Sequence, residues 1–222
     1  MSLGHKVDSR VWSRDASTVN AWYSNYENAL FIPAGMLTKP FFSPDFPIEQ
    51  NFGGLGTIMG HEMTHGFDER GAKIDENGEV AKWWGDAAVE QFDRRVDCVK
   101  GLYSSFEIDG RAVSGSKTVS ENIADFGGLK VAYRAYVSWY KNTYGGDPPM
   151  HSKQLFFIAY SQNWCTKQRQ SIVEFRLARD VHAPEPFRSN GAVAHNPSFA
   201  QVFSCPLGIL RPSRSPGFDR TY

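Results

Sequence analysis

The chain has no excess of charge of either sign, and this balance argues against two kinds of partner. Lys plus Arg and Asp plus Glu both number 24 among the 222 residues. A nucleic-acid-binding domain carries a basic patch or stripe, and a polybasic segment is typical of contact with anionic lipid. We therefore expect no nucleic-acid partner and no electrostatic docking on a membrane.

Long apolar runs and a leader pattern are also missing. No stretch approaches the ~20 apolar residues of a membrane helix, and no charged segment followed by an apolar one marks a signal peptide. The opening Met1-Ser2-Leu3 looks like the remnant of an expression tag. We expect a leader and lead-in at residues 1–18, one domain at 19–205 and a disordered tail, rich in Pro, Gly, Ser and Arg, at 206–222.

Cysteine is scarce. Cys98, Cys165 and Cys205 are an odd number that cannot all pair within one chain, and their separations do not match a zinc cluster. Three buried thiols, as in an intracellular protein, are one interpretation.

The sequence does contain an H-E-x-x-H motif with a glycine on each side. On a helix, His61 and His65 lie on one face and can both reach one Zn²⁺, while Glu62 is turned towards a water on the metal. So short a pattern arises by chance in roughly one chain in a hundred. The hypothesis of a zinc site therefore needs a third ligand.

The segment Glu-Asn-Ile-Ala-Asp at 121–125 offers that ligand. Glu121 and Asp125 share a helix face, so Glu121 can complete a His₂Glu site that leaves one position open. Asp125 would accept the free ring N–H of a ligating histidine and fix its tautomer, and Asp68 is a second candidate for that role. Alone, the pair would be a solvated helix face; beside the histidine motif, we interpret it as ligand and orienting residue.

Four segments in order resemble the catalytic domain of the neprilysin and endothelin-converting-enzyme family of zinc metallopeptidases. They are the two motifs above, Val19-Asn20-Ala21-Trp22-Tyr23, and Val181-His182-Ala183-Pro184 with Phe187-Arg188. The resemblance runs from about Val19 to Cys205. It implies a thermolysin-like fold, one Zn²⁺ per chain and endopeptidase activity on short peptides.

The resemblance also implies roles around the cleft. Asn20 and Ala21 would bind substrate backbone along a cleft edge, His182 would donate a hydrogen bond to the oxyanion, and Arg188 would bind the substrate carbonyl beyond the cleaved bond. The residues that would line an apolar pocket for the side chain after that bond are Met36, Phe41 and Trp164.

Members of the resembled family are extracellular or cell-surface proteins, either type II membrane proteins or secreted ones. Their equivalent cysteines bridge to segments outside this region, and an N-terminal helical domain covers the cleft. We therefore expect this chain to be a fragment with an open cleft and apolar surface that favours self-association. Its C-terminus departs from the family pattern, which closes with a Met-Asn-Pro segment, a last cysteine and a terminal tryptophan.

Periodicity and turn signals predict an α+β fold that is mostly helical, with a small sheet in the first third. We expect strands at 19–26 and 29–32, helices at 53–71, 83–106, 120–139, 155–167 and 197–203, and a rigid proline-rich loop at 181–188. Ser120 is expected to cap its helix.

Three functions remain open at this point: an extracellular zinc endopeptidase, a zinc-binding domain that lost its competence with its N-terminal half, and a cytosolic metallohydrolase with free thiols. Glu62 argues against a purely structural zinc, because closed structural sites use four protein ligands and need no base.

Overall fold

The computed structural model describes residues 12–205, and helices dominate this part of the chain. The α-helices are α1 Ile48–Asn51, α2 Thr57–Thr64, α3 Asp86–Ser104, α4 Gly115–Tyr144, α5 Met150–Gln162, α6 Gln170–Arg179, α7 Glu185–Ala194 and α8 Pro197–Val202. This confirms the predicted α+β class with a large helical share. The expected tail at 206–222 lies outside the described residues, as does most of the leader.

The strands form two short hairpins. β1 (Trp22–Ser24) pairs antiparallel with β2 (Ala29–Phe31), and β3 (Glu107–Ile108) pairs with β4 (Arg111–Ala112). The sheet expected in the first third is thus present, but its strands are shorter than predicted, and Asn20 and Ala21 precede β1. The second hairpin lies between the helices predicted at 83–106 and 120–139, where no strand was predicted. Its turn is Asp109-Gly110, with φ of 53° and 71°, a combination typical of two-residue hairpins.

The histidine motif lies near the end of one continuous helical rod. The rod begins with α1, passes through a π-helical turn at Phe52–Gly56, continues as α2 and ends in a 3₁₀ turn at His65–Phe67. It therefore starts before the predicted Gly53. Within the π turn, a Cβ on Gly53 would lie 2.1 Å from the carbonyl oxygen of Phe156. Glycine is required there because the rod passes directly against the backbone of α5.

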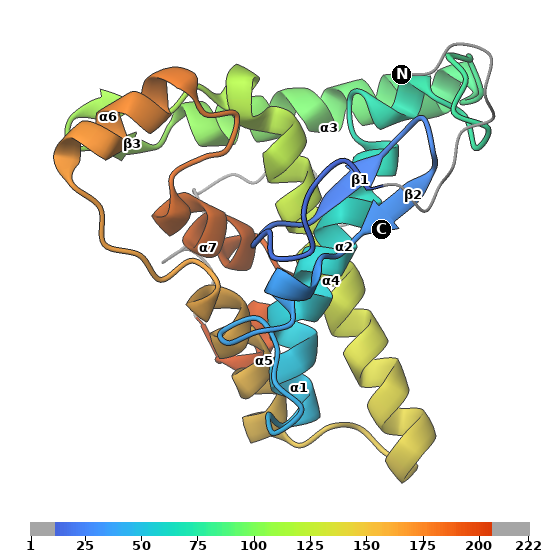
Figure 1. The fold of residues 1–222 in the computed structure, drawn as a ribbon, viewed down its shortest axis with the longest axis vertical. Coiled ribbons are helices and arrows are strands. Elements are labelled where there is room, and N and C mark those ends of the chain that lie inside the picture. The colour runs from blue at the N-terminus through green and yellow to red at the C-terminus, as the bar shows by residue number, and fades with distance from the viewer. Residues whose placement is uncertain (1–11, 206–222) are drawn as a thin grey trace.

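Close backbone contact also joins α2 to α4, the two helices that lie side by side in the centre of Figure 1. A Cβ on Gly128 would lie 2.5 Å from the amide nitrogen of His61, and a Cβ on Gly60 would lie 2.9 Å from the carbonyl oxygen of Gly128. Neither backbone can retreat without moving its helix. The glycines therefore let the helix with the histidines approach the helix with Glu121 and Asp125.

The start of α4 corrects one expectation. Ser114, not Ser120, caps this helix, and its hydroxyl accepts a hydrogen bond from the Lys117 amide. Ser120 lies inside the helix, more than a turn after its start. As a result, Glu121 and Asp125 project from an interior stretch of a 30-residue helix rather than from a frayed end.

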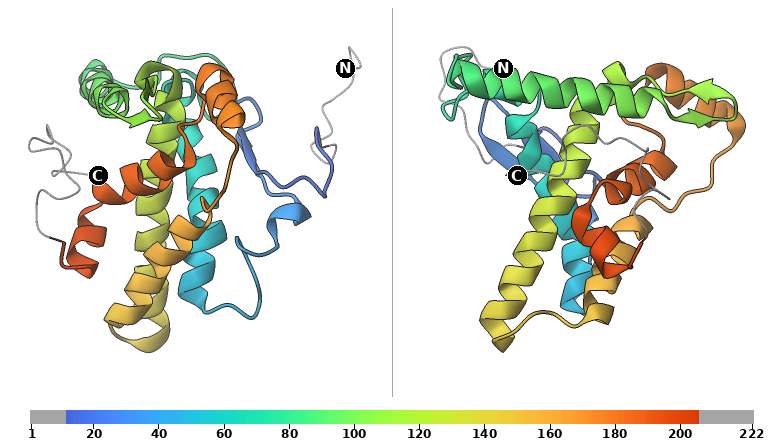
Figure 2. Two further views of the ribbon diagram at one scale, coloured as in Figure 1. Left: turned by 90° about the vertical axis from the view of Figure 1, so that its left-hand side faces the viewer. Right: turned by 180° about the vertical axis from the view of Figure 1, so that it is seen from behind.

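Two apolar clusters hold the helices around α4. α3 crosses the upper end of α4 (Figures 1 and 2), and this cluster contains Val99, Tyr103 and Val119. The larger cluster lies lower and joins side chains of α4, α5, α7 and α8. It contains Leu129, Tyr136, Phe156, Phe157, Tyr160, Ala192 and Val202 with their neighbours.

The segment after α5 differs most from expectation. α5 begins directly after Pro149 and ends at Gln162, and the described chain then forms α6, which was not predicted. The loop expected at 181–188 stops at Pro184, because α7 begins at Glu185 with Pro186 in its first turn. Proline is tolerated there because first-turn amides have no partner within the helix. Arg188 is therefore a helical residue.

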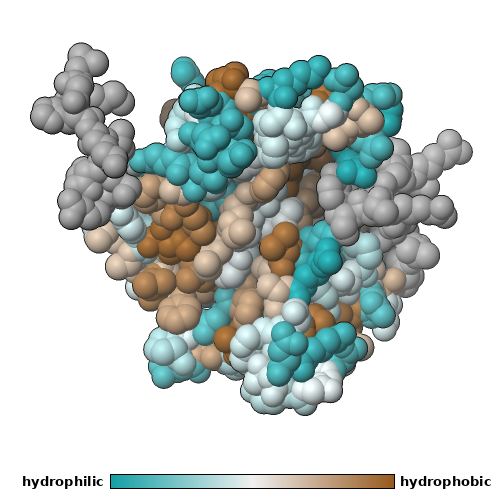
Figure 3. All heavy atoms as spheres, turned by 90° about the vertical axis from the view of Figure 1, so that its right-hand side faces the viewer, coloured by the Kyte–Doolittle hydropathy of each residue, from teal (hydrophilic) through white to brown (hydrophobic). Residues whose placement is uncertain are grey.

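Large apolar side chains also reach the surface. Met59, Met63 and Phe67 follow one another at intervals of about one turn along the helical rod. Their exposed fractions lie between 38% and 56%. Apolar residues also gather on the face shown in Figure 3. The predicted self-association remains a prediction. None of the helices between residues 12 and 205 is both long and apolar enough to cross a bilayer.

Candidate metal centre

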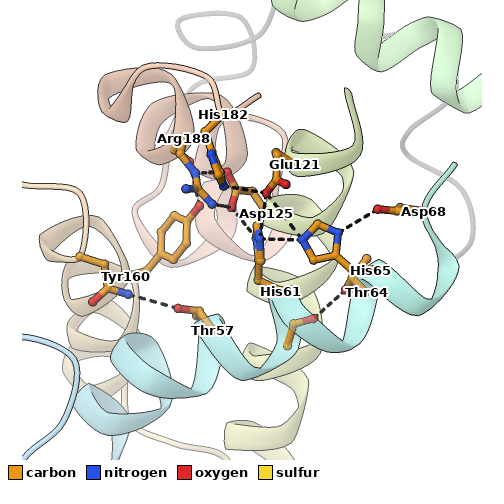
Figure 4. A network of polar contacts seen from close by, with 12 residues as sticks. Thr57, His61, Thr64, His65, Asp68, Glu121, Asp125, Tyr160, His182 and Arg188 are labelled. Carbon is orange, nitrogen blue, oxygen red and sulfur yellow. Dashed lines mark hydrogen bonds and ion pairs between the residues drawn. The ribbon is translucent and has the colours of Figure 1, made fainter. Parts of the chain in front are cut away.

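Three potential metal ligands converge where α2 meets α4. The Nε2 atoms of His61 and His65 lie 3.1 Å apart, and Glu121 Oε2 lies 3.2 Å from the first and 3.6 Å from the second. Among the described residues, these three side chains form a group whose ligand atoms lie close enough together to hold one metal ion. Figure 4 shows them pointing at one another from the two helices.

Each imidazole is held by a carboxylate at its other nitrogen. His61 Nδ1 lies 2.8 Å from Asp125 Oδ1, and His65 Nδ1 lies 2.8 Å from Asp68 Oδ2. Asp68 is itself fixed, because its Oδ1 accepts hydrogen bonds from the backbone amides of Arg70 and Gly71. These contacts orient both rings and favour a hydrogen on Nδ1, which leaves the Nε2 lone pairs facing the centre.

This arrangement fits a zinc ion. Two neutral rings that give their Nδ1 hydrogens to carboxylates have only lone pairs to present to each other, so their Nε2 atoms cannot hydrogen-bond. Glu121 Oε2 adds a third electron-rich atom, which is buried and lies within 3.6 Å of both Nε2 atoms. A cation at the centre would satisfy all three, and two imidazoles with one carboxylate are a ligand set of catalytic zinc.

The charges around the centre favour a cation. Burial alone lowers the pKa of His65, but Asp68 and Glu121 outweigh it and raise that pKa to about 10. Burial raises the pKa of Glu121, and the neighbouring histidines His182, His61 and His65 reverse this and hold it well below its usual range. A site that attracts a proton so strongly also attracts a metal ion.

Glu62 follows His61 directly on α2, within a turn of His65, and is buried. Burial raises the pKa of its carboxyl above the ordinary value, because the charged form loses hydration. A carboxylate of raised pKa is a stronger base than one in water. Its position beside the ligands suits proton transfer at the metal.

His182 approaches Glu121 from the segment before α7. Its Nε2 lies 3.1 Å from Glu121 Oε2, and its Nδ1 lies 2.7 Å from Asp180 Oδ1. The backbone amide of His182 donates to the same Asp180 oxygen. Asp180 therefore fixes both the main chain and the ring of His182. Asp180 was not predicted as a site residue, although its place two residues before the histidine suits a short side-chain-to-backbone turn.

Arg188 reaches the centre from α7 and pairs with Asp125. Its Nε donates to Asp125 Oδ2 at 2.8 Å and its Nη2 to Oδ1 at 2.7 Å. Burial raises the pKa of Asp125, but the Arg188 guanidinium outweighs that effect and lowers it. Asp125 therefore stays ionised while buried, and its Oδ1 contacts both Arg188 and His61. Asp125, which was expected to orient a histidine, therefore also connects His61 to Arg188, which was expected to bind substrate.

The remaining candidates lie on other elements of the fold. Ala21 is buried and Asn20 exposed at the start of the first hairpin, and a Cβ on Gly66 would touch the nearby Tyr23 side chain. Met36 is buried in a 3₁₀ turn, and the Phe41 carbonyl accepts a hydrogen bond from the Leu55 amide in the π turn. Their roles in binding substrate stay predictions. Trp164 stacks on Arg188, with the guanidinium carbon 3.9 Å from the ring centroid.

The cysteines do not distinguish an extracellular protein from a cytosolic one. Within residues 12–205 no disulfide joins Cys98, Cys165 and Cys205, and Cys165 is exposed. The bridges implied by the resemblance would run to segments outside this region, so the structure does not test them.

Comparison with known proteins connects this centre to peptidases. A family model described as Peptidase family M13 matches residues 20–213. Endothelin-converting enzyme-like 1 of Rattus norvegicus is 40% identical over 209 residues, which are 92% of this chain and 27% of the relative. Membrane metallo-endopeptidase-like 1 of Mus musculus is 40% identical over 93% of this chain and 28% of the relative. The chain thus spans about a quarter of the length of these relatives.

Solved structures also resemble this chain in fold. The zinc metalloprotease ZMP1 of Mycobacterium tuberculosis, in complex with an inhibitor, matches with a TM-score of 0.87 and 35% identity, over 92% of this chain and 32% of the other. PepO of Lactobacillus rhamnosis matches with a TM-score of 0.84 and 35% identity, over 99% and 32%.

Proposed function

The chain belongs to peptidase family M13, and from that premise we propose that it is the catalytic part of a zinc endopeptidase that cleaves short peptides. Relatives in the family support a metallopeptidase, and therefore a hydrolase, in general terms. The observation that carries the finer proposal is the convergence of His61 Nε2, His65 Nε2 and Glu121 Oε2 directly beside a buried Glu62.

His61, His65 and Glu121 are the proposed zinc ligands, with Asp125 and Asp68 orienting the two rings. When bound, zinc acts as a Lewis acid that acidifies water and polarises a carbonyl group. The chain supplies three ligands, and this leaves the metal accessible to substrate.

Glu62 is the proposed general base and acid. Its carboxylate takes the proton of the attacking water and gives it to the leaving amine as the peptide bond breaks. Burial suits this group to the task, because a raised pKa brings its proton affinity closer to neutral pH. The proton transfer requires Glu62 and no other side chain of α2.

His182 and Arg188 are proposed to bind the substrate around the cleaved bond. The Nε2 edge of His182 faces the centre. Burial lowers the pKa of this ring, but Glu121 and Asp180 outweigh that effect and raise it. The protonated ring carries a hydrogen on Nε2 as well as on Nδ1, and its Nε2–H can donate to the oxygen that becomes negative. Asp125 occupies Nε and Nη2 of Arg188, which leaves the Nη1 edge for a substrate carbonyl. Asn20 and Ala21 are proposed to hold the extended substrate backbone, as in strand addition.

Substrates and location are proposed by the same reasoning. We propose short peptides as substrates and an extracellular or cell-surface location, as the family resemblance implies. The remaining segments of a longer protein, including an N-terminal helical domain, are proposed as partners that cover the cleft.

A second candidate is a zinc-binding domain that needs those segments for turnover. The observation that favours it is the share of about a quarter that this chain covers in its relatives. The matched residues include every proposed ligand, so zinc binding is common to both candidates.

A peptide-cleavage assay separates them. The zinc-loaded protein is incubated with short peptides blocked at both ends, and products are identified by mass spectrometry. Internal cleavage that a chelator abolishes and added zinc restores supports the endopeptidase. Zinc-loaded protein that cleaves none of the peptides supports the second candidate.

A further inference from the structure

The guanidinium of Arg188 is held on two sides. Asp125 engages one edge of the planar group through two hydrogen bonds, and the indole of Trp164 covers one face at 3.9 Å. Arg188 is 9% exposed and Asp125 2% exposed, so little water competes with either contact. A cation over an aromatic face is stabilised most when both are removed from water.

The backbone of Arg188 is held from α5, the helix that ends just before Trp164. The hydroxyl of Tyr160, near the end of α5, donates to the carbonyl oxygen of Arg188 at 2.7 Å, and Tyr160 is only 2% exposed. Trp164 follows one turn later, just past the last residue of α5. The C-terminal end of α5 therefore contacts both the main chain and the side chain of Arg188, as Figure 4 shows for Tyr160.

This placement suggests another role for Trp164 than the pocket-lining role implied by the resemblance. One face of the Trp164 ring stacks on Arg188, so at that face the ring contacts Arg188 and not a substrate side chain. We propose that Trp164 and Tyr160 are positioning residues for Arg188: they hold its free edge towards the substrate backbone, and Trp164 acts on peptides through Arg188. This inference rests on the proposed role of Arg188 in binding peptides.

The two roles of Trp164 predict different kinetics. If Trp164 acts through Arg188, Trp164→Ala raises KM roughly tenfold for every peptide, whichever side chain follows the cleaved bond, and leaves kcat nearly unchanged. If Trp164 lines a pocket, the loss is large for peptides with a bulky residue there and small for those with alanine. A loss that follows side-chain size would overturn the proposal.

A double-mutant cycle sharpens this test. Arg188→Lys keeps the charge but loses the planar group that Asp125 and Trp164 hold. Once Arg188 is replaced, Trp164→Ala should add little further loss, because residues that act through one another are not additive. Trp164→Phe keeps an aromatic face and should recover most of the wild-type KM. Full additivity in the cycle contradicts the proposal.

A measurement without turnover keeps the inference separate from the proposed function. The Nε–H signal of Arg188 in a ¹⁵N NMR spectrum is identified by its loss in Arg188→Lys. The signal should be shifted by the Trp164 ring current, move in Trp164→Ala and move less in Trp164→Phe and Tyr160→Phe. The Nε–H of Arg176, which bonds to Asp180, is the internal control and should stay in place.

An Arg188 signal that does not move in either Trp164 variant refutes the positioning role. If zinc-loaded wild-type protein cleaves no peptide, the proposed function fails, and the NMR comparison still decides the inference. Trp164→Phe and Tyr160→Phe also preserve the test if Trp164→Ala does not fold, because each removes only part of a side chain.

Discussion

The ligand half of the site, on α2 and α4, depends on helix spacing, whereas the half formed by residues 180–188 depends on contacts with distant elements. His61 and His65 are four residues apart on the helical rod, at the end of α2 and in the 3₁₀ turn that follows it, and Glu121 and Asp125 are one turn apart on α4. By contrast, His182 is placed by its contacts with Asp180 and Glu121, and Arg188 by Asp125, Trp164 and Tyr160.

The two halves are held by different kinds of contact and are connected through Asp125. The ligand half is held by glycine contacts between two backbones, which are stiff, and the other half by side chains, which can be changed one at a time. Asp125 is common to both, because its Oδ1 contacts His61 and Arg188. Substitutions should therefore affect zinc binding, substrate binding or both, according to the half they touch.

The largest effect is expected from Glu62→Gln. The amide cannot accept the proton of water, and general acid–base groups typically contribute roughly 10²–10⁴-fold to rate. Turnover should fall by about that factor, while zinc content, measured by elemental analysis, stays at the wild-type level. Retained turnover in this variant would contradict the role given to Glu62.

Asp125→Asn should damage both halves at once. The change leaves the Arg188 charge buried without its partner, and breaking a buried ion pair costs about 3–5 kcal/mol. Thermal and chemical unfolding should show that loss, and zinc affinity should fall because His61 is no longer oriented.

The matched control for this variant is Glu90→Gln, which breaks an exposed ion pair with Arg94 on α3. Exposed pairs contribute little, so no measurable change in stability or zinc affinity is expected. Equal losses of stability and zinc affinity in the two variants would show that Asp125 does not connect the two halves.

Asp180→Asn should affect the second half alone. His182 loses the carboxylate that fixes its ring, and loss of such an orienting partner typically costs about 10- to 100-fold in activity. Peptide cleavage should fall by that amount with zinc affinity unchanged. Arg176→Gln, which removes an ion pair from the other side of Asp180 but leaves His182 bonded, should reduce cleavage less.

The smallest effect is expected from Gly128→Ala, which tests the contact between α2 and α4. The added Cβ would meet the His61 amide nitrogen at 2.5 Å, and overpacking of this kind costs about 1–3 kcal/mol. Unfolding experiments should show the loss, together with weaker zinc binding.

Gly101→Ala is the control for that variant. Gly101 lies in the interior of α3 with nothing within 4 Å of an added Cβ, so alanine should stabilise the helix by about 0.5–1 kcal/mol. If both glycine variants bind zinc as the wild type does, the glycine contact does not set the ligand geometry.

The ligand half was predictable because it depends on local periodicity. Residues four apart share a helix face whatever the rest of the chain does, so the pair His61 and His65 and the pair Glu121 and Asp125 could each be placed on one face. That the two faces meet was inferred from the need of a zinc site for a third ligand, because the contact of His61 with Asp125 joins positions 64 residues apart. The cap at Ser114 and the first turn of α7 were missed. In both places, competing signals at Ser120 and at the prolines of 184–186 favoured another boundary.

The other half could not be derived from spacing. The contact of Arg188 with Asp125 joins positions 63 residues apart, and that with Tyr160 joins positions 28 apart. Only the resemblance suggested His182 and Arg188, and it gave no role to Asp180 or Tyr160. Trp164 was expected at the site, but its stacking on Arg188 depends on where α5 ends, which periodicity placed too late.

Metal analysis of the purified chain, with His61→Ala alongside, tests the central claim most directly. We expect about one zinc per chain in the wild type and none in the variant, with both chains folded by circular dichroism. A folded wild-type chain that takes up no zinc after reconstitution, or a His61→Ala chain that keeps it, would contradict the metal centre at α2 and α4.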